Sequence, residues 1–297
     1  MVRYNLLLFT LVLIVYIVTI CGNLLTIILV YFSKTLHSPM YFFLSQLSIS
    51  DIILITDIAP HILNIVLHEL TSISFSGCIT QYYIYGTIET FERYLLTVMS
   101  YDRYLAICSP LHYVSIMKQT LCIRLVLASW ICSCSMVLIP TLGLCQLEFC
   151  GSNVIDYLFC DFNPLMELSC SDTSNVKLEA TLLCVPVLIF PFLGIVVSYT
   201  YIVLTILKIS SFSGRLKSFP TCSSHLTVVF IFYGTLIAAY LIPKEGQSCT
   251  ISKIMSLLYT VFTPFVNPFI YSLRNKEIKD SLNLFCINKR LFIQNLW

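Results

Sequence analysis

The chain has 297 residues, of which 58% are hydrophobic and only 11% are charged. Its mean hydropathy of +0.87 is too high for a water-soluble domain of this size. The composition therefore predicts an integral membrane protein and leaves no room for a separate soluble domain. The net charge of +2 says little as a total, but the distribution of the charges along the chain is informative.

Apolar runs of about 20 residues, long enough to cross a membrane, occur seven times along the chain. The first run is too long for the apolar part of a signal peptide, so we expect it to remain as a span. The runs predict spans at roughly residues 6–30, 40–67, 79–106, 121–144, 178–207, 220–242 and 251–273, followed by a short amphipathic helix at about 275–287. We therefore expect an all-α membrane protein, a seven-transmembrane helix bundle that forms a single domain over residues 1–297.

The basic and acidic residues of the connecting segments fall on opposite sides if the spans alternate in direction. Lys118, Lys208 and Arg274 belong to the basic side, whereas Glu148 and Asp172 belong to the acidic side. Basic loops are typically cytoplasmic. The pattern therefore predicts an extracellular amino terminus and a cytoplasmic carboxyl terminus.

Ionisable residues occur inside the second and third spans, where charged side chains normally face the interior of a bundle. Glu89 and Arg93 are four residues apart and can neutralise each other on one helix face. A structural ion pair is the favoured interpretation, with a ligand contact as the alternative. Asp51 and Glu92 have no obvious fixed cation that matches both. Two carboxylates at one level either share a proton or hold a small cation, and sodium is the favoured occupant.

The third span ends in Asp102-Arg103-Tyr104, where apolar residues meet a basic loop. Burying either charge in lipid would cost several kcal/mol, so we expect the pair at the aqueous rim of the membrane. There it can hold one conformation until a cytoplasmic partner competes for it. The motif therefore predicts a conformational switch.

Four cysteines are expected on the outer, oxidising side of the membrane. Cys78 lies at the start of the third span, and Cys150, Cys160 and Cys170 lie in the long acidic loop between the fourth and fifth spans. Two bridges can form in any of three connectivities. A loop of about 30 residues that is tied down by disulfides would form a lid over an outer cavity.

The last three spans contain prolines that interrupt helical hydrogen bonding. Pro186 and Pro191 are expected to bend the fifth span around a cavity. Residues 217–226 carry cationic and hydroxyl groups at the inner end of the sixth span, where they can face an acidic partner. Asn267-Pro268 predicts a hinge in the seventh span, with Tyr271 one turn beyond it.

In this combination, the chain resembles the rhodopsin-like (class A) G-protein-coupled receptors, and among them the olfactory (odorant) receptors. The resemblance covers nearly the whole chain. Asp102-Arg103-Tyr104 and Asn267-Pro268-x-x-Tyr271 are typical of the larger class. Stretches that are more specific to odorant receptors occur in the expected order: residues 36–44, residues 99–108, the three loop cysteines, residues 217–226 and residues 268–275.

The resemblance implies a receptor rather than an enzyme. A small, volatile odorant would bind within the bundle, and the receptor would activate a heterotrimeric G protein of the stimulatory type and raise cyclic AMP at the plasma membrane. Its partners would be the odorant, the G protein and membrane lipid, with no nucleic acid. The resemblance also implies an ion site at Asp51 and Glu92, and no other cofactor.

Individual residue roles follow from the resemblance as well. Cys78 would pair with Cys160, and Cys150 with Cys170. The G-protein switch would consist of Asp102, Arg103, Tyr104, Tyr199, His225, Asn267, Pro268 and Tyr271. The odorant pocket would lie between the third, fifth and sixth spans under the outer loop, lined by Tyr85, Gly86, Glu89, Thr90, Phe162, Leu183, Val187, Tyr233, Ile237, Tyr240 and Thr260.

One residue departs from the family pattern in a way that matters for the pocket. Arg93 stands where the family usually has a small residue, and a buried arginine must be paired. A second hypothesis, a proton- or sodium-coupled membrane transporter, would use the intramembrane acids as an ion path. It predicts internal repeats between the two halves of the chain, and the sequence shows none.

Overall fold

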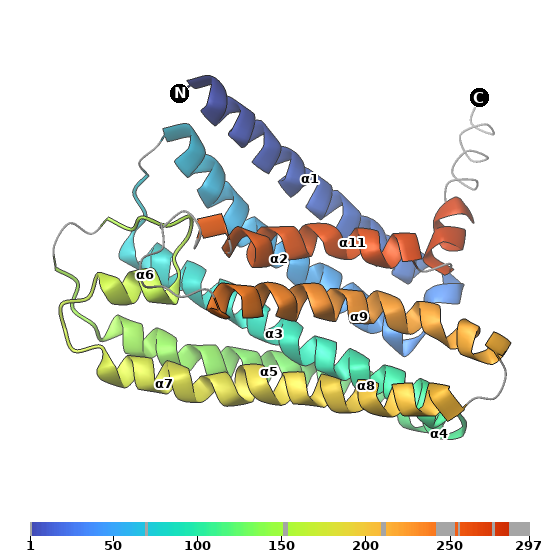
Figure 1. Ribbon diagram of the computed structural model, residues 1–297. Helices are drawn as coiled ribbons and strands as arrows, with labels where there is room; N and C mark the ends of the chain where they lie inside the picture. The colour runs from blue at the N-terminus through green and yellow to red at the C-terminus, as the bar shows by residue number, and fades with distance from the viewer. Residues whose placement is uncertain are drawn as a thin grey trace, which may run out of the picture.

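The computed structural model describes residues 2–68, 71–150, 154–208, 212–241, 253–254, 256–274 and 277–284. Regular structure in these residues is helical, apart from an isolated β-bridge between Phe149 and Ser169. The long helices lie side by side in an elongated bundle (Figure 1). The elements in chain order are α1 (Val2–Phe32), the 3-10 turn η1 (Lys34–Leu36), α2 (Pro39–His68), α3 (Phe75–Cys108), α4 (Pro110–Ile116), α5 (Gln119–Cys145), α6 (Phe162–Glu167), α7 (Ser174–Cys184), the π-helical turn η2 (Val185–Ile189), α8 (Phe190–Lys208), α9 (Phe212–Leu241), the π-helical turn η3 (Leu258–Phe262) and α11 (Thr263–Arg274).

Each predicted span overlaps a helical stretch of the described residues, and the ends differ by up to eight residues: α9 begins at Phe212, whereas the sixth span is predicted from residue 220. The fifth span is a continuous stretch made of α7, η2 and α8, and the prolines at 186 and 191 are accommodated within it. Among the described residues, four stretches are long and apolar enough by themselves to cross a membrane: Asn5–Phe32, Pro39–His68, Gln119–Cys145 and Ser174–Lys208. Helix α3 is also long, but its ionisable residues lower its hydropathy.

Helix α3 lies in the middle of the bundle and packs against α2, α5, α8 and α9. Its side chains Leu95, Leu96 and Met99 are fully buried. The ring of Phe91 stacks on Trp130 of α5, with 4.0 Å between the ring centroids. Helix α3 is therefore a buried element that several neighbouring helices share.

Large apolar side chains cover much of the outer surface of the bundle. Leu7, Ile131, Phe190 and Phe230 are 69%, 66%, 61% and 77% exposed, respectively. A water-soluble monomer rarely exposes so much contiguous apolar surface. In a lipid bilayer these side chains meet hydrocarbon, as the composition predicts.

We call the end of the bundle that carries the disulfides the disulfide end, and the opposite end, where α3 meets α4, the Asp102 end; they lie at the left and right of Figure 1. At the disulfide end, Cys78 is bonded to Cys160 and Cys150 to Cys170, with Cα atoms 5.4 Å and 5.9 Å apart. Of the three connectivities that the sequence allows, this is the one implied by the family resemblance.

Residues 277–284 form a short helix at the Asp102 end. Ile278 is 2% exposed, whereas Lys279 and Asp280 are exposed, so this helix is amphipathic as predicted. Tyr41 Oη donates a hydrogen bond of 2.6 Å to Glu277 Oε2. The helix is therefore held against α2 through its polar residues as well as its apolar face.

Gln81 of α3 connects the disulfide end to α2. Its Nε2 donates to the Asp57 carbonyl at 3.0 Å, and its Oε1 accepts from the Cys160 backbone N–H at 2.9 Å. Gln81 is 6% exposed and Cys160 is 1% exposed, so the Cys160 backbone N–H has no ready access to water.

We expect Gln81→Met to destabilise the receptor, because it removes both hydrogen bonds at nearly constant side-chain volume. The buried Cys160 N–H left without a partner costs about 1–3 kcal/mol, so thermal unfolding of the purified protein in detergent should occur at a clearly lower temperature. Gln146→Met is the matched control, since Gln146 is exposed. Equal unfolding temperatures for the two variants would contradict the role of Gln81.

Candidate functional site

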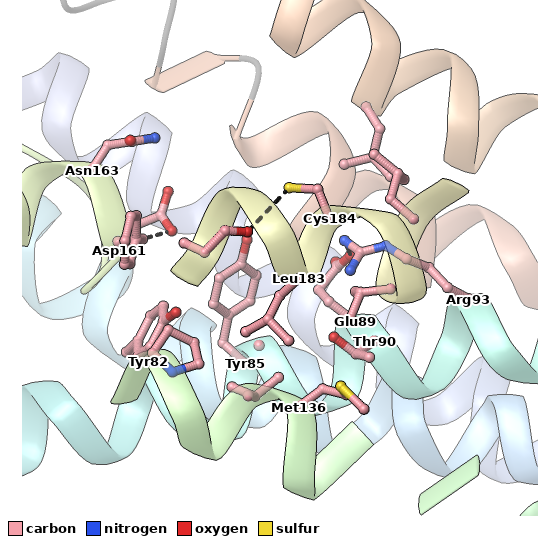
Figure 2. A pocket seen from close by; sticks show the side chains of 18 of the residues that line it. Tyr82, Tyr85, Glu89, Thr90, Arg93, Met136, Asp161, Asn163, Leu183 and Cys184 are labelled. Atoms are coloured by element: carbon pink, nitrogen blue, oxygen red, sulfur yellow. Dashed lines mark hydrogen bonds and ion pairs between the residues drawn. The ribbon is translucent and has the colours of Figure 1, made fainter. Parts of the chain in front are cut away.

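A cavity of about 520 Å³ lies near the disulfide end, bounded by α3, α5, α7 and η2 and by residues of the loop before α6. Figure 2 shows its lining, with Tyr85, Glu89 and Arg93 following one another along α3. These residues are four apart, so they lie on one helix face. The same face of α3 therefore presents an aromatic ring, an acid and a base to the cavity.

Most of the predicted ligand-binding residues line this cavity. They are Tyr85, Gly86, Glu89, Thr90, Phe162, Leu183 and Val187. Gly86 is needed for the close approach of α3 to α5, since a Cβ atom there would lie 3.0 Å from Val137 Cγ1. Whether these residues contact a ligand stays a prediction, but the structure brings them together.

Other predicted ligand-binding residues are placed elsewhere. The Tyr233 ring is buried and packs on the rings of Phe192 and Phe232, with centroids 5.0 Å and 5.5 Å away. Ile237 is 47% exposed on the outer surface. The Thr260 hydroxyl donates to the Ser256 carbonyl at 2.7 Å. The Tyr240 side chain lies outside the described residues.

The differences have a geometric cause. Neighbouring residues, Leu236, Ser256 and Tyr259, line the cavity instead. The π-helical turn η3 shifts the phase of the side chains before α11, and an ideal helical period does not reproduce this shift. The sequence prediction also missed the walls from α5 and α7, whose residues Met136, Val137, Pro140, Lys177, Ala180, Thr181 and Cys184 line the cavity.

The outer loop contributes to the roof of the cavity through Tyr157, Asp161 and Asn163 as well as Phe162. Tyr85 Oη donates to Tyr259 Oη at 3.3 Å, and the Tyr85 ring lies edge-on to Phe159. The part of the cavity nearest the disulfides is therefore largely aromatic. This arrangement agrees with the predicted lid.

Glu89 and Arg93 form an ion pair on the cavity lining, with 3.3 Å between Glu89 Oε2 and Arg93 Nη2. Glu89 is 2% exposed. The Arg93 guanidinium also lies over the Phe232 ring of α9, 5.7 Å from its centroid. The structural ion pair that the spacing favours is therefore present, and its two members also face the cavity.

Asp51 and Glu92 lie deeper in the bundle, where both are almost fully buried. Asn267 Nδ2 donates to both carboxylate oxygens of Asp51, at 3.1 Å and 3.2 Å. Ser50 Oγ donates to Glu92 Oε1 at 3.0 Å. Among the described residues, no group of three or more His, Cys, Asp and Glu side chains could hold a metal ion.

At the Asp102 end, the Asp102 carboxylate is fully buried and is contacted by two residues. Its Oδ2 accepts from Arg103 Nε at 2.9 Å and is also paired with Arg103 Nη2. Its Oδ1 accepts from Tyr113 Oη of α4 at 2.8 Å. Burial, followed by the Asp102 charge, raises the pKa of Tyr113. The sequence prediction treated this region as a loop and did not find Tyr113.

The remaining predicted switch residues surround this end of the bundle. Tyr199 Oη lies 2.6 Å from His225 Nδ1, which links α8 to α9. Tyr271 is buried, and its hydroxyl has no hydrogen-bond partner in the described part of the chain. Tyr104 instead packs its ring against Tyr101 and Tyr201, away from the Asp102 carboxylate.

Pro268 lies inside α11, which continues through it without a break. It also faces α1, where a Cβ atom on Gly22 would lie 3.2 Å from Pro268 Cβ. Asn23 Nδ2 donates to the Pro264 carbonyl at 3.2 Å. The predicted hinge region is therefore in close contact with α1.

Comparison with known proteins agrees with this geometry. The fold is similar to the crystal structure of squid rhodopsin, with a TM-score of 0.77, covering 95% of this chain and 85% of that chain at 16% sequence identity. Among curated proteins, olfactory receptor 1468 of Rattus norvegicus is 45% identical over 93% of this chain and 88% of its own length. Olfactory receptor 6J1 of Homo sapiens is 47% identical over 94% of this chain and 80% of its own length.

The family model described as olfactory receptor matches residues 12–289. This match and the similarity to full-length relatives favour a signalling receptor over the transporter hypothesis and over an enzyme. The chain belongs to the olfactory receptor family.

Proposed function

We propose that this chain is an odorant receptor of the plasma membrane that binds a small, volatile ligand in the cavity and activates a heterotrimeric G protein of the stimulatory type, which raises cyclic AMP. The observation that supports this most directly is that α3 both lines the cavity, with Glu89 and Arg93, and carries Asp102 and Arg103 at its other end. In this proposal the disulfide end is extracellular and the Asp102 end is cytoplasmic.

The ligand acts by shifting a population between two conformations. The described conformation, in which Asp102 holds Arg103, is the inactive one in this proposal. A ligand shifts the balance only by its difference in affinity for the two states. In the active state α9 moves outward, the Tyr199–His225 contact rearranges, and Arg103 becomes available to the G protein.

We also propose that a sodium ion binds between Asp51 and Glu92 and stabilises the inactive state. Both carboxylates are buried, and the salt bridges in the described part of the chain include neither of them. Carboxylate, hydroxyl and amide oxygens are suitable ligands for a hard cation. Ser50 and Asn267, which already contact the two acids, lie at this site.

Arg103→Ala should abolish the ligand-dependent rise in cyclic AMP, because the cation that the G protein would engage is missing. The response should fall to that of cells without the receptor, whereas surface staining is retained. Arg124→Ala is the control, since Arg124 lies on the exposed face of α5. An unchanged response in a surface-expressed Arg103→Ala receptor would refute the switch assignment.

Tyr113→Phe should raise the basal cyclic AMP signal without ligand. The change removes the hydroxyl that donates to Asp102, and a hydrogen bond to a charged group contributes about 1.5–3 kcal/mol. We expect a basal signal several-fold above wild type in transfected cells with equal surface expression. Basal signalling at or below the wild-type level would mean that Tyr113 does not hold the inactive state.

Sodium should raise the unfolding temperature of the purified receptor when it replaces choline at constant ionic strength. Ligand binding to the folded state stabilises it by about 1.4 kcal/mol at ten times the dissociation constant. Asp51→Asn should remove this sodium effect, and Asp57→Asn, on the same helix, should retain it. A sodium effect that persists in Asp51→Asn would exclude Asp51 from the ion site.

A further inference from the structure

Glu89 has one carboxylate oxygen that the ion pair with Arg93 does not use. Oε2 lies 3.3 Å from Arg93 Nη2. Oε1 is buried, and it accepts no hydrogen bond from any group that the structure describes. The side chain lines the cavity although it is only 2% exposed. Figure 2 shows Glu89 on the α3 side of the cavity, beside Thr90 and Arg93.

A buried acceptor without a donor is unfavourable, by about 1–3 kcal/mol for a neutral group and more for a charged one. A ligand that brings an O–H or N–H group to Oε1 removes this cost. A ligand with only acceptor atoms leaves it in place and adds repulsion between lone pairs. The Glu89 carboxylate therefore discriminates between ligands of similar shape according to whether they carry an O–H or N–H donor.

The charges around Glu89 narrow the ligand class further. Arg93 is already engaged, by the Glu89 carboxylate on one side and by the Phe232 ring 5.7 Å away on another. Asp161, at the N-terminal end of α6, lines the cavity together with Glu89. The bases of the lining are Arg93 and Lys177, so the cavity contains charges of both signs. A carboxylate group that approached Oε1 would nevertheless meet the like charge of Glu89, which disfavours an anionic ligand group at this position.

The rest of the cavity favours an apolar body for the ligand. Leu183, Val187 and Leu236 contribute aliphatic side chains to the lining, and Tyr85 contributes an aromatic ring. Burying the hydrocarbon part of a ligand against such walls is favourable by a free energy of roughly 25 cal/mol per Å² of apolar surface removed from water. The polar contact at Glu89 then orients the ligand within them.

We propose that Glu89 Oε1 forms a ligand-binding subsite that accepts a hydrogen bond from the O–H or N–H group of a small, otherwise apolar ligand. The receptor then prefers alcohols, phenols and amines to ethers, aldehydes, ketones and carboxylate anions of the same shape. This inference rests on the proposed function, because it takes the cavity to be the ligand site.

The test uses isomeric or matched probes that differ in the donor. The linear set is 1-octanol, octylamine, 1-methoxyheptane, octanal and the octanoate anion at neutral pH, and the aromatic pair is 2-phenylethanol and benzyl methyl ether. Binding is measured as the shift in thermal unfolding of the full-length receptor in lipid nanodiscs, and signalling as cyclic AMP in cells. A hydrogen bond to a charged acceptor predicts that the donor compounds bind at least about tenfold more tightly than their donor-free partners.

A double variant, Glu89→Leu with Arg93→Leu, tests the subsite without leaving one buried charge unpaired. We expect it to bind the alcohol and the ether with affinities within about twofold of each other. Val187→Ala is the matched control, because it alters the cavity wall and keeps the carboxylate; its overall affinity can change, but its preference for donors should remain. Should the double variant fail to fold, the wild-type receptor's relative affinities for the donor and donor-free probes still test the subsite.

The possible outcomes distinguish a failure of the Glu89 subsite from a failure of the proposed receptor function. Equal binding of alcohol and ether by the wild-type receptor, or a donor preference that survives in the double variant, would overturn the subsite and leave the receptor function intact. Binding of none of the probes would overturn the subsite together with the assignment of the cavity as a ligand site. Tighter binding of octylamine than of 1-octanol would support the subsite and identify a cationic donor as its preferred partner.

Discussion

The structure depends on the pairing of charged side chains along α3 inside an otherwise apolar bundle. Glu89 is paired with Arg93, Glu92 accepts from Ser50, and Asp102 is paired with Arg103. Removing one member of such a buried pair typically costs about 3–5 kcal/mol. In a membrane, lipid is as apolar as the helix surfaces, so polar contacts and close packing hold helices together. Helix α3 therefore holds these charges close to partners on α3 itself and on α2, although Glu89 Oε1 has no hydrogen bond in the described part of the chain.

The same pairing connects the two ends of the molecule. Arg93 touches the cavity on one side and the Phe232 ring of α9 on the other. Nearer the Asp102 end, α9 also meets α8 through His225 and Tyr199. A change in the position of the Arg93 guanidinium would therefore be transmitted to α9 through direct contact with the Phe232 ring. Arg93 therefore lies at the point where ligand binding in the cavity and movement of α9 would be coupled.

Much of the fold could be predicted from the sequence, because a membrane imposes helices of a known length and apolar character. The Glu89–Arg93 pair could be predicted as well, since a spacing of four residues determines that contact locally. The disulfide pairing could not be deduced from the cysteine positions, which allow three connectivities; only the family resemblance singled out the observed one.

Contacts between elements distant along the chain were harder to predict. Tyr113 reaches Asp102 only because α4 folds as a helix directly after α3, and no periodic pattern indicated that helix. Tyr259 lines the cavity and Thr260 does not, since η3 is a π-helical turn that changes the side-chain phase. The walls from α5 and α7 depend on how closely α3 approaches α5, which Gly86 permits. These features depend on packing, which hydropathy does not encode.

The contact between α1 and α11 has a consequence for how the bundle can move. Gly22 leaves room for Pro268, and Asn23 binds the Pro264 carbonyl, so the two backbones touch and are also hydrogen-bonded. Helix α1 cannot slide along α11 without breaking one of these contacts. Helices α1 and α11, far apart in the sequence, therefore form a fixed pair, against which the other helices shift.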